Sequence, residues 1–232
     1  MEKLKQILTG GSNWYMQEID EDTRRKDLEA ALKRGNHKSA KTFHSELVKS
    51  MSKEVIKGWM LPLPIEAAKE IPGLELAPLG VADRLGVNAK GNFVPKLRTT
   101  HDLSFPGAYS GISVNKRVYQ SRQEPCMFGH TLSRIVHRIV SIRSRHPHGI
   151  ILIRKDDFKS AYRRIHLNQK IAIKCATQLT IEEITYLMIY LRLSFGGSPC
   201  PPEFCVLADI ITYITNDLFS DKCWDPAITK SK

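Results

Sequence analysis

The sequence predicts an α+β fold built on an antiparallel sheet. Three observations support this class: the first 60 residues are charged and helical in pattern, short strand patterns with glycine turns follow, and a helical pattern ends the chain. Helices and strands that fall into separate blocks are typical of α+β domains, whereas a regular alternation would predict a parallel sheet. Apolar residues make up 42% and charged residues 25% of the 232 positions, a balance that excludes a wholly disordered chain.

Two helices are expected in the first 60 residues. Residues 23–34 are rich in good helix formers, and Gly35 followed by Asn36 ends that pattern. A second helix is predicted over residues 38–57 and is closed by Gly58. Its apolar side chains recur at every fourth position, which predicts a face packed in the core: Phe43, Leu47, Met51 and Val55.

Four prolines interrupt the chain after these helices: Pro62, Pro64, Pro72 and Pro78. They predict a boundary between a helical lead-in and the main domain, because proline disrupts helices and central strands. Beyond the boundary, residues 76–84 and 92–103 are expected to form the two strands of a β-ribbon, joined around residues 86–91.

A third helix is predicted over residues 131–145. Its apolar positions share one face, which is expected to be buried: Leu132, Ile135, Val136, Ile139 and Val140. Arg134 and Arg138 lie outside that face. A buried strand is expected next at residues 149–157, because residues 150–153 are all aliphatic.

Two more strands and a last helix complete the expected order. The strands are predicted over residues 171–178 and 185–193. The helix is expected to begin after Ser198, since Pro201 and Pro202 are tolerated in a first turn.

Positive charge is concentrated in one part of the chain. The formal net charge is +11, and residues 116–170 contain 13 Lys and Arg against 3 Asp and Glu. These cations alternate with apolar residues, so the segment predicts a polyanionic partner such as nucleic acid or nucleoside phosphates. The alternative is a solvated basic surface that serves solubility.

The cysteines and the hydropathy of the sequence predict the cellular environment of the protein. Five cysteines at irregular spacings, with no Cys-x-x-Cys pair, predict reduced thiols in an intracellular protein. The apolar runs are too short to span a bilayer, and no secretory signal pattern opens the chain, so no membrane partner is expected. The sequence does not decide between cytoplasm and nucleus.

The charged residues 154–159 are the strongest candidate for a catalytic site, because they follow an expected buried strand. Consecutive strand residues face opposite sides of a sheet, so Asp156 and Asp157 cannot both point into one site. One carboxylate is therefore the candidate catalytic group. The alternative is a strand-end acid that pairs with Arg154 or Lys155.

Three segments resemble sequence motifs of reverse transcriptases and occur in the same order. Asp157 is followed by an apolar residue, Lys, any residue, Ala and an aromatic residue, which resembles the first catalytic motif. Residues 195–204 resemble the second, with an aromatic-Gly start, Pro at the seventh place and Phe at the tenth. Residues 94–104 resemble the fingers ribbon, and Asn115 fits the Asn that follows it. The likeness covers about residues 76–218.

The resemblance implies the fingers and part of the palm of a right-hand polymerase, with an antiparallel palm sheet. It divides the chain into a helical region at residues 1–72, fingers at 73–149 and a partial palm at 150–232. The implied activity is that of an RNA-directed DNA polymerase, which transfers deoxynucleotides under template direction through two Mg²⁺ ions, or Mn²⁺ in their place. The implied partners are an RNA or DNA template with its primer and deoxynucleoside triphosphates; the oligomeric state stays open.

The resemblance also assigns roles to single residues. Asp157 would hold both metal ions, with the backbone carbonyl of Phe158 as a further ligand. Tyr162 would exclude a 2′-hydroxyl, although a plain core aromatic is the alternative. The incoming nucleotide would meet the remaining predicted binding residues: Arg98 and Lys96 at the triphosphate, and Phe195 and Gly196 at the new base pair. A turn before a helix is the alternative for Gly196 and Gly197. Contacts with nucleic acid are expected from five further cations: Arg134, Arg138, Lys159, Arg163 and Arg164.

The sequence departs from the family in one respect that matters for activity. Reverse transcriptases carry a second metal-binding pair of acids in a Tyr-x-Asp-Asp hairpin, and that motif is absent from these 232 residues. The chain therefore resembles a polymerase truncated before the catalytic hairpin, and alone it is expected to be inactive. The alternative is a non-catalytic remnant that binds nucleic acid. Phosphate-loop and dinucleotide-binding motifs do not occur.

Overall fold

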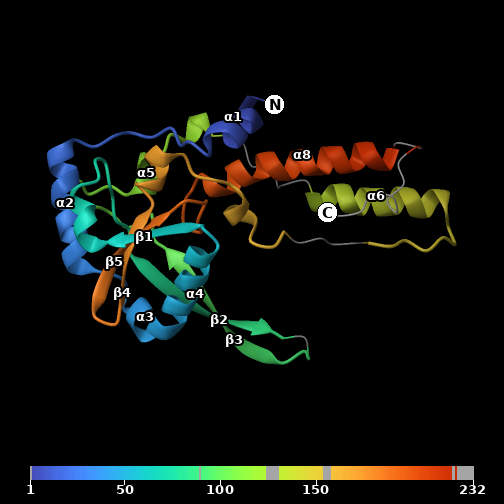
Figure 1. The fold of residues 1–232 in the computed structure, drawn as a ribbon. Coiled ribbons are helices and arrows are strands. Elements are labelled where there is room, and N and C mark those ends of the chain that lie inside the picture. Colours follow the sequence, from blue (N-terminus) through green and yellow to red (C-terminus); the bar gives the residue numbers. More distant parts are fainter. Residues whose placement is uncertain (1, 89, 124–130, 154–157, 221–222, 224–232) are drawn as a thin grey trace.

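A three-stranded antiparallel sheet with the order β1-β5-β4 lies at the centre of the computed structural model (Figure 1). The structure describes residues 2–88, 90–123, 131–153, 158–220 and 223. Strand β5 (Ile184–Tyr190) is the middle strand, with β4 (Ala176–Ile181) on one side and β1 (Met60–Pro64) on the other. The predicted α+β class with an antiparallel sheet is confirmed.

The proline-rich segment forms an edge strand of this sheet. In the register of β1 with β5, Met60 pairs with Tyr190 and Pro64 with Tyr186. Proline cannot donate a hydrogen bond to a sheet, so an edge position suits Pro62 and Pro64. The segment expected as a boundary therefore joins the lead-in to the sheet.

The predicted β-ribbon is confirmed as a hairpin. Strands β2 (Leu79–Val87) and β3 (Phe93–His101) pair antiparallel, from Leu79 with His101 at the base to Val87 with Phe93 at the tip. The hairpin projects beyond the rest of the molecule (Figure 1), and Leu85 and Phe93 near its tip are exposed.

Four helices precede the sheet: α1 (Glu2–Gly10), α2 (Glu21–Arg34), α3 (Lys38–Thr42) and α4 (His44–Ile56). Asp20 caps the start of helix α2, because its side chain accepts from the backbone N–H of Thr23, and Gly35, with a φ of 72°, caps its end. The single helix predicted over residues 38–57 is wrong, because Phe43 leaves helical geometry between α3 and α4. Its apolar stripe is confirmed, since Leu47 and Met51 are buried.

Short elements connect the hairpin to the sheet. They are the 3₁₀ helices η1 (Ile65–Lys69), η2 (Gln120–Arg122) and η3 (Ala161–Arg164), with the short helices α5 (Val114–Arg117) and α7 (Gln169–Ala172). The strand predicted over residues 171–178 begins only at Ala176. The side chain of Asn168 accepts from the backbone N–H of Lys170 and so caps α7, which takes the first residues of that segment.

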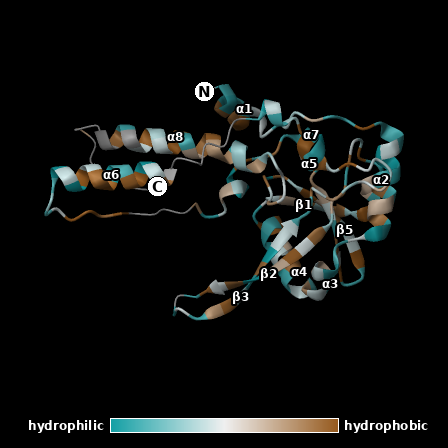
Figure 2. Cartoon of the chain, turned by 180° about the vertical axis from the view of Figure 1, so that it is seen from behind, coloured by the Kyte–Doolittle hydropathy of each residue, from teal (hydrophilic) through white to brown (hydrophobic). Residues whose placement is uncertain are grey.

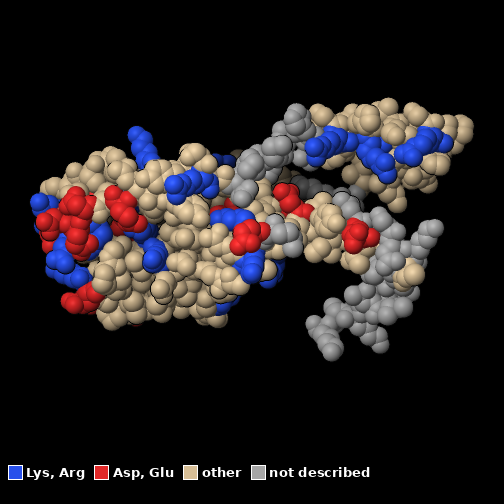
Figure 3. Space-filling model, turned by 90° about the horizontal axis from the view of Figure 1, so that it is seen from above, with Lys and Arg blue, Asp and Glu red and all other residues tan. Residues whose placement is uncertain are grey.

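Helices α6 (Thr131–Arg145) and α8 (Cys200–Ser220) form two arms that project from the same side of the molecule (Figures 1 and 2). Seen from above, the arms are separate along their outer parts (Figure 3). The predicted bounds of α6 and the predicted start of α8 after Ser198 are confirmed.

The burial predicted for α6 and for the segment after it is wrong. Leu132, Ile135, Val136 and Val140 are exposed, and Ile150, Leu152 and Ile153 are exposed and not part of a strand. Amphipathic spacing fixes which side chains share a face, but burial also needs a second element against that face, and the described chain supplies none here.

One hydrophobic core joins all three predicted regions. It contains Leu47 from the first, Leu79 and Leu103 from the second, and Leu167 and Leu187 from the third. The division at residues 72 and 149 stays a prediction. No described helix combines the length and apolarity needed to cross a bilayer.

Candidate functional site

A pocket of about 570 Å³ lies between the hairpin, helix α4 and the 3₁₀ helix η3. Its lining comes from four parts of the chain: Ser50 and Glu54 of α4, Ala82 and Arg84 of β2, residues 97–100 of β3, and Ser160, Tyr162, Arg163 and Phe195. Volumes of this size are typical of small-molecule sites.

The pocket brings together residues from all three resembling segments. Arg98 comes from β3, Tyr162 from η3 and Phe195 from the loop before α8. The rings of Tyr162 and Phe195 lie 4.9 Å apart at an interplanar angle of 58°. Phe204 meets the edge of Tyr162 at 5.8 Å, so the aromatic wall is supported from α8.

Gly196 has a backbone position that only glycine fits. Its φ is +121°, and a Cβ atom there would overlap the carbonyl oxygen of His101. Asn115 fixes the same loop: its Nδ2 donates to the Gly196 carbonyl at 2.6 Å, and its Oδ1 accepts from the Ser198 N–H at 2.8 Å. The side chain of Phe195 is thereby held at the pocket by backbone contacts on its C-terminal side.

Three arginines and one glutamate give the pocket a positive charge. Arg163 is engaged internally: its Nε lies 2.6 Å from Glu54 Oε2, its Nη1 donates to the Leu193 carbonyl at 2.7 Å, and it covers the Tyr190 ring. Arg84 and Arg98 are exposed and have no ion-pair partner among the described residues. They are therefore the cations available to an anionic ligand.

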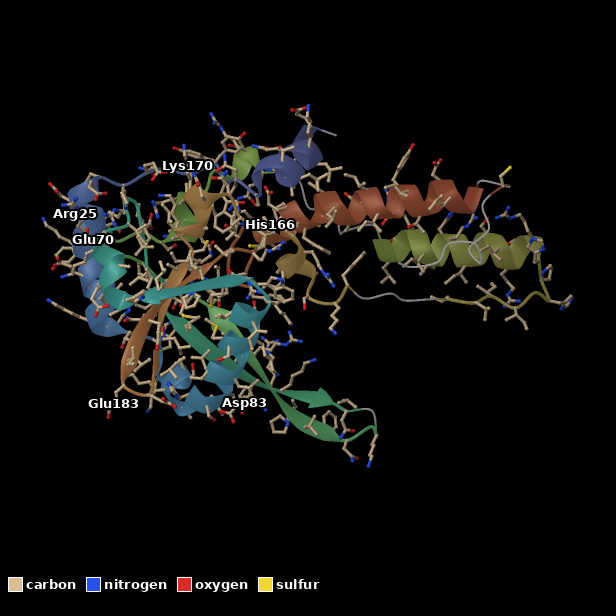
Figure 4. The ribbon with its side chains drawn as sticks, viewed as in Figure 1. Arg25, Glu70, Asp83, His166, Lys170 and Glu183 are labelled. Carbon is tan, nitrogen blue, oxygen red and sulfur yellow. The ribbon has the colours of Figure 1, made fainter. Side chains whose placement is uncertain are left out.

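The register of the hairpin explains why Arg84 faces the pocket. Ala82 pairs with Arg98, and alternate residues of a strand share a face, so Ala82 and Arg84 point to the same side. Asp83, on β2 in Figure 4, belongs to the opposite face. Its cross-strand partner Leu97 lines the pocket, but Asp83 itself does not.

Several residues predicted for the site lie elsewhere. Lys96 is exposed on β3 outside the lining, and Phe158 packs edge-on against Phe204 at 5.7 Å. Lys159 before η3 and Arg164 at its end are exposed, and the Arg164 Nε donates to the Lys159 carbonyl. The α6 arm carries two further predicted contacts, Arg134 and Arg138, away from the pocket.

The predicted metal ligand Asp157 lies outside the described residues, as does Asp156. Within the described residues, no group of three or more acidic, histidine or cysteine side chains could hold a metal ion. Glu54 is the one carboxylate of the described pocket lining, and Arg163 pairs with it. The described lining therefore does not fit Mg²⁺, and that ion stays a prediction.

His101 connects the pocket to the core. Its ring stacks on Tyr190 with centroids 4.7 Å apart, and its nitrogens lie 3.3 Å from Ser194 Oγ and from the Ala176 carbonyl. Burial lowers the pKa of His101 from its ordinary 6.5 to about 4, and the charge of Arg163 acts in the same direction. The imidazole is therefore neutral at neutral pH.

Folding stability is expected to fall when the pH is lowered from about 7.5 to about 5. Between pH 6.5 and 4 the unfolded chain protonates His101 whereas the folded chain does not, so stability rises with pH across this window and is lost as the pH falls. The loss at pH 5 is about 2 kcal/mol, measured by urea unfolding at the two pH values. The His101→Gln variant lacks this titrating group. Its loss of stability over the same pH interval should therefore be about 2 kcal/mol smaller than that of the wild type. Equal losses of stability in the two proteins would contradict the lowered pKa of His101 as the cause of the pH dependence.

No family model matches the chain, and no curated protein sequence matches it.

Two charged residues of the pocket lining, Glu54 and Arg84, were missed by the sequence reasoning. Glu54 lies on a helix predicted for its apolar stripe, and nothing in its sequence context indicated the contact with Arg163. Arg84 could have been found, because the expected ribbon places residues of β2 opposite Lys96 and Arg98 once the turn is fixed.

Proposed function

We propose that the chain is the fingers and first part of the palm of an RNA-directed DNA polymerase, and that its pocket receives a deoxynucleoside triphosphate. The observation that carries the proposal is the meeting of Arg98, Tyr162 and Phe195 in one pocket. These residues come from segments separated by about 60 and 30 positions in the chain, and each segment resembles a reverse transcriptase motif in its sequence.

The chemistry of the lining suits such a ligand. Arg98 and Arg84 are planar donors that bind phosphate oxygens in pairs, and they lie on the hairpin side of the pocket. The tilted pair of Tyr162 and Phe195 supplies an apolar wall for the sugar and base. Since Gly196 bears no side chain, the backbone after Phe195 leaves room for close approach.

The remaining parts of the proposal rest on the resemblance alone. They are the role of Asp157, the metal ions, the template and primer, and the expectation that this chain alone does not polymerise. Arg163 is less suited to nucleic acid than the other predicted cations, because Glu54 and the Leu193 carbonyl already occupy its guanidinium.

A second candidate is a remnant that binds nucleic acid without catalysis. Two exposed cations favour it, Lys159 before η3 and Arg164 at its end, because contacts with phosphates require charge and no metal-binding carboxylate. The two candidates differ in whether the pocket recognises a single nucleotide.

The Arg98→Ala variant is expected to bind deoxynucleoside triphosphate about tenfold more weakly than the wild type, since it removes a charge-assisted contact with phosphate. The measurement is the fluorescence titration of a labelled deoxyguanosine triphosphate in the presence of Mg²⁺. Arg25→Ala is the matched control: Arg25 is exposed on α2, on the other side of the molecule from the hairpin (Figure 4).

Equal affinities of the Arg98→Ala, Arg25→Ala and wild-type proteins would contradict the proposed pocket. Binding of RNA with a steep salt dependence, without nucleotide binding, would favour the non-catalytic remnant.

A further inference from the structure

A second pocket, the β4-edge pocket, has a volume of about 410 Å³ and lies along strand β4, which is an edge strand of the three-stranded sheet. Its lining comes from α2 and the turn after it, from α3, from α4 and from the sheet: residues 32–36, Ala40, Lys41, His44, Leu47, residues 178–180 and Thr185. It shares no lining residue with the pocket that contains Arg98. Its volume is typical of a small-molecule site.

The hydrogen bonds of β4 show which backbone groups face this pocket. The Tyr190 N–H donates to the Cys175 carbonyl at 3.3 Å, immediately before β4 and β5 pair in register. Because bonding and non-bonding residues alternate along an antiparallel pair, the odd-numbered residues of β4 bond to β5. Gln178 and Thr180 therefore direct their backbone N–H and C=O groups outward, away from β5.

Both outward carbonyls are already bonded to side chains. Asn36 Nδ2 donates to the Gln178 carbonyl at 2.6 Å, and His44 Nε2 donates to the Thr180 carbonyl at 2.7 Å. No hydrogen bond among the described residues uses the outward N–H of Thr180. An added β-strand needs free donors and free acceptors along the edge, so the pocket suits a ligand that brings only acceptors.

The charge of the lining favours an anion. Lys33 and Lys41 are exposed and have no ion-pair partner among the described residues. No carboxylate lines the pocket in the described part of the chain, and Glu183, labelled in Figure 4, lies in the turn after β4 outside the lining. Arg34 is less available, because its guanidinium stacks 4.1 Å from the centre of the Phe105 ring. A concave site with charges of one sign concentrates the positive potential.

The end of α2 does not cancel this potential. The last carbonyls of a helix carry the negative end of its dipole and would repel an anion. Here Gln178 Nε2 donates to the Ala31 carbonyl at 3.0 Å and to the Leu32 carbonyl at 3.2 Å, and the Gly35 N–H also donates to Ala31. Leu32 and Ala40 add apolar surface to the lining, which suits the organic part of a ligand.

We propose that the β4-edge pocket binds a small phosphorylated molecule. Lys33 and Lys41 pair with its phosphate oxygens, and the Thr180 N–H donates to the same group. A phosphate monoester carries more charge and more acceptor oxygens than a carboxylate, so it makes fuller use of these separate donors. The proposal is independent of the proposed polymerase function, because neither lysine lines the pocket that contains Arg98.

The test measures the binding of ribose 5-phosphate to the full chain by isothermal titration calorimetry. This probe carries a phosphate but no base, so the aromatic wall of Tyr162 and Phe195 contributes little to its binding. The double variant Lys33→Ala with Lys41→Ala removes both cations. Lys38→Ala is the matched control, since Lys38 is exposed on α3 but lies outside the lining. All three lysines are exposed, and circular dichroism checks that each variant is folded.

The double variant is expected to bind ribose 5-phosphate at least tenfold more weakly than the wild type, because two charge-assisted contacts are lost. Lys38→Ala should bind as the wild type does. Replacing Lys33 and Lys41 by Arg keeps both charges and should preserve binding. No binding by the wild type, unchanged binding by the double variant, or an equal loss in Lys38→Ala would each overturn the proposal. Weaker RNA binding by the double variant, without any binding of ribose 5-phosphate, would assign the two lysines to nucleic acid instead.

Discussion

The Gly196→Ala variant should lose about 3 kcal/mol or more of its free energy of unfolding. Two costs combine at this position. A side chain at a φ of +121° is strained whatever the space around it, and the added Cβ would overlap the carbonyl oxygen of His101. The overlapping atom belongs to the backbone at the end of β3, so a change of side-chain rotamer cannot relieve it.

Urea unfolding of three glycine variants separates these costs. Gly58→Ala has a φ of +65° with open space around the new Cβ, and it should lose about 1 kcal/mol through strain alone. Gly10→Ala has open space and no positive φ, and it should be nearly neutral. A loss at Gly196 no larger than at Gly58 would show that the loop moves away from His101, which would contradict the tight contact described for the pocket.

The sequence predicted elements whose cause is local. The hairpin of β2 and β3 follows from strand patterns on either side of a glycine turn, and α6 follows from a 3.6-residue apolar period. The break at Phe43 and the edge strand at Pro62 were missed. They depend on how α3 packs on β2 and on a partner strand more than 120 residues later in the chain.

The candidate site shows the same division. Arg98, Tyr162 and Phe195 could be named because motif spacing identifies residues without requiring knowledge of their contacts. The engagement of Arg163 by Glu54 could not be predicted, since it depends on the position of α4 relative to η3. The exposure of the apolar face of α6 could not be predicted from the sequence pattern either. Periodicity shows which side chains share a face, but not whether another element packs against that face.

The second large effect is expected at Glu75, whose carboxylate compensates two buried cations. Arg117 Nη2 pairs with Glu75 Oε2, and Lys174 Nζ lies 3.2 Å from Glu75 Oε1. The side chain of Arg117 is 2% exposed and that of Lys174 is 7% exposed. Removing one partner of a buried ion pair leaves an uncompensated charge, which costs more than the pair itself contributes.

The Glu75→Gln variant is expected to lose about 3–5 kcal/mol of stability, measured as the free energy of urea unfolding. Glu18→Gln is the matched control, because Glu18 contacts the same lysine: its Oε2 lies 2.7 Å from Lys174 Nζ, but its side chain is 69% exposed. Solvent screens that pair, so the control should lose less than about 1 kcal/mol.

A double variant tests whether the loss at Glu75 comes from uncompensated charge. Lys174→Met added to Glu75→Gln removes one of the two cations and keeps an apolar side chain of similar length, so it should recover part of the lost stability. A double variant less stable than Glu75→Gln would attribute the effect to lost packing. Equal losses in Glu75→Gln and Glu18→Gln would show that water reaches the carboxylate of Glu75, and the buried network would then contribute little to the stability of the fold.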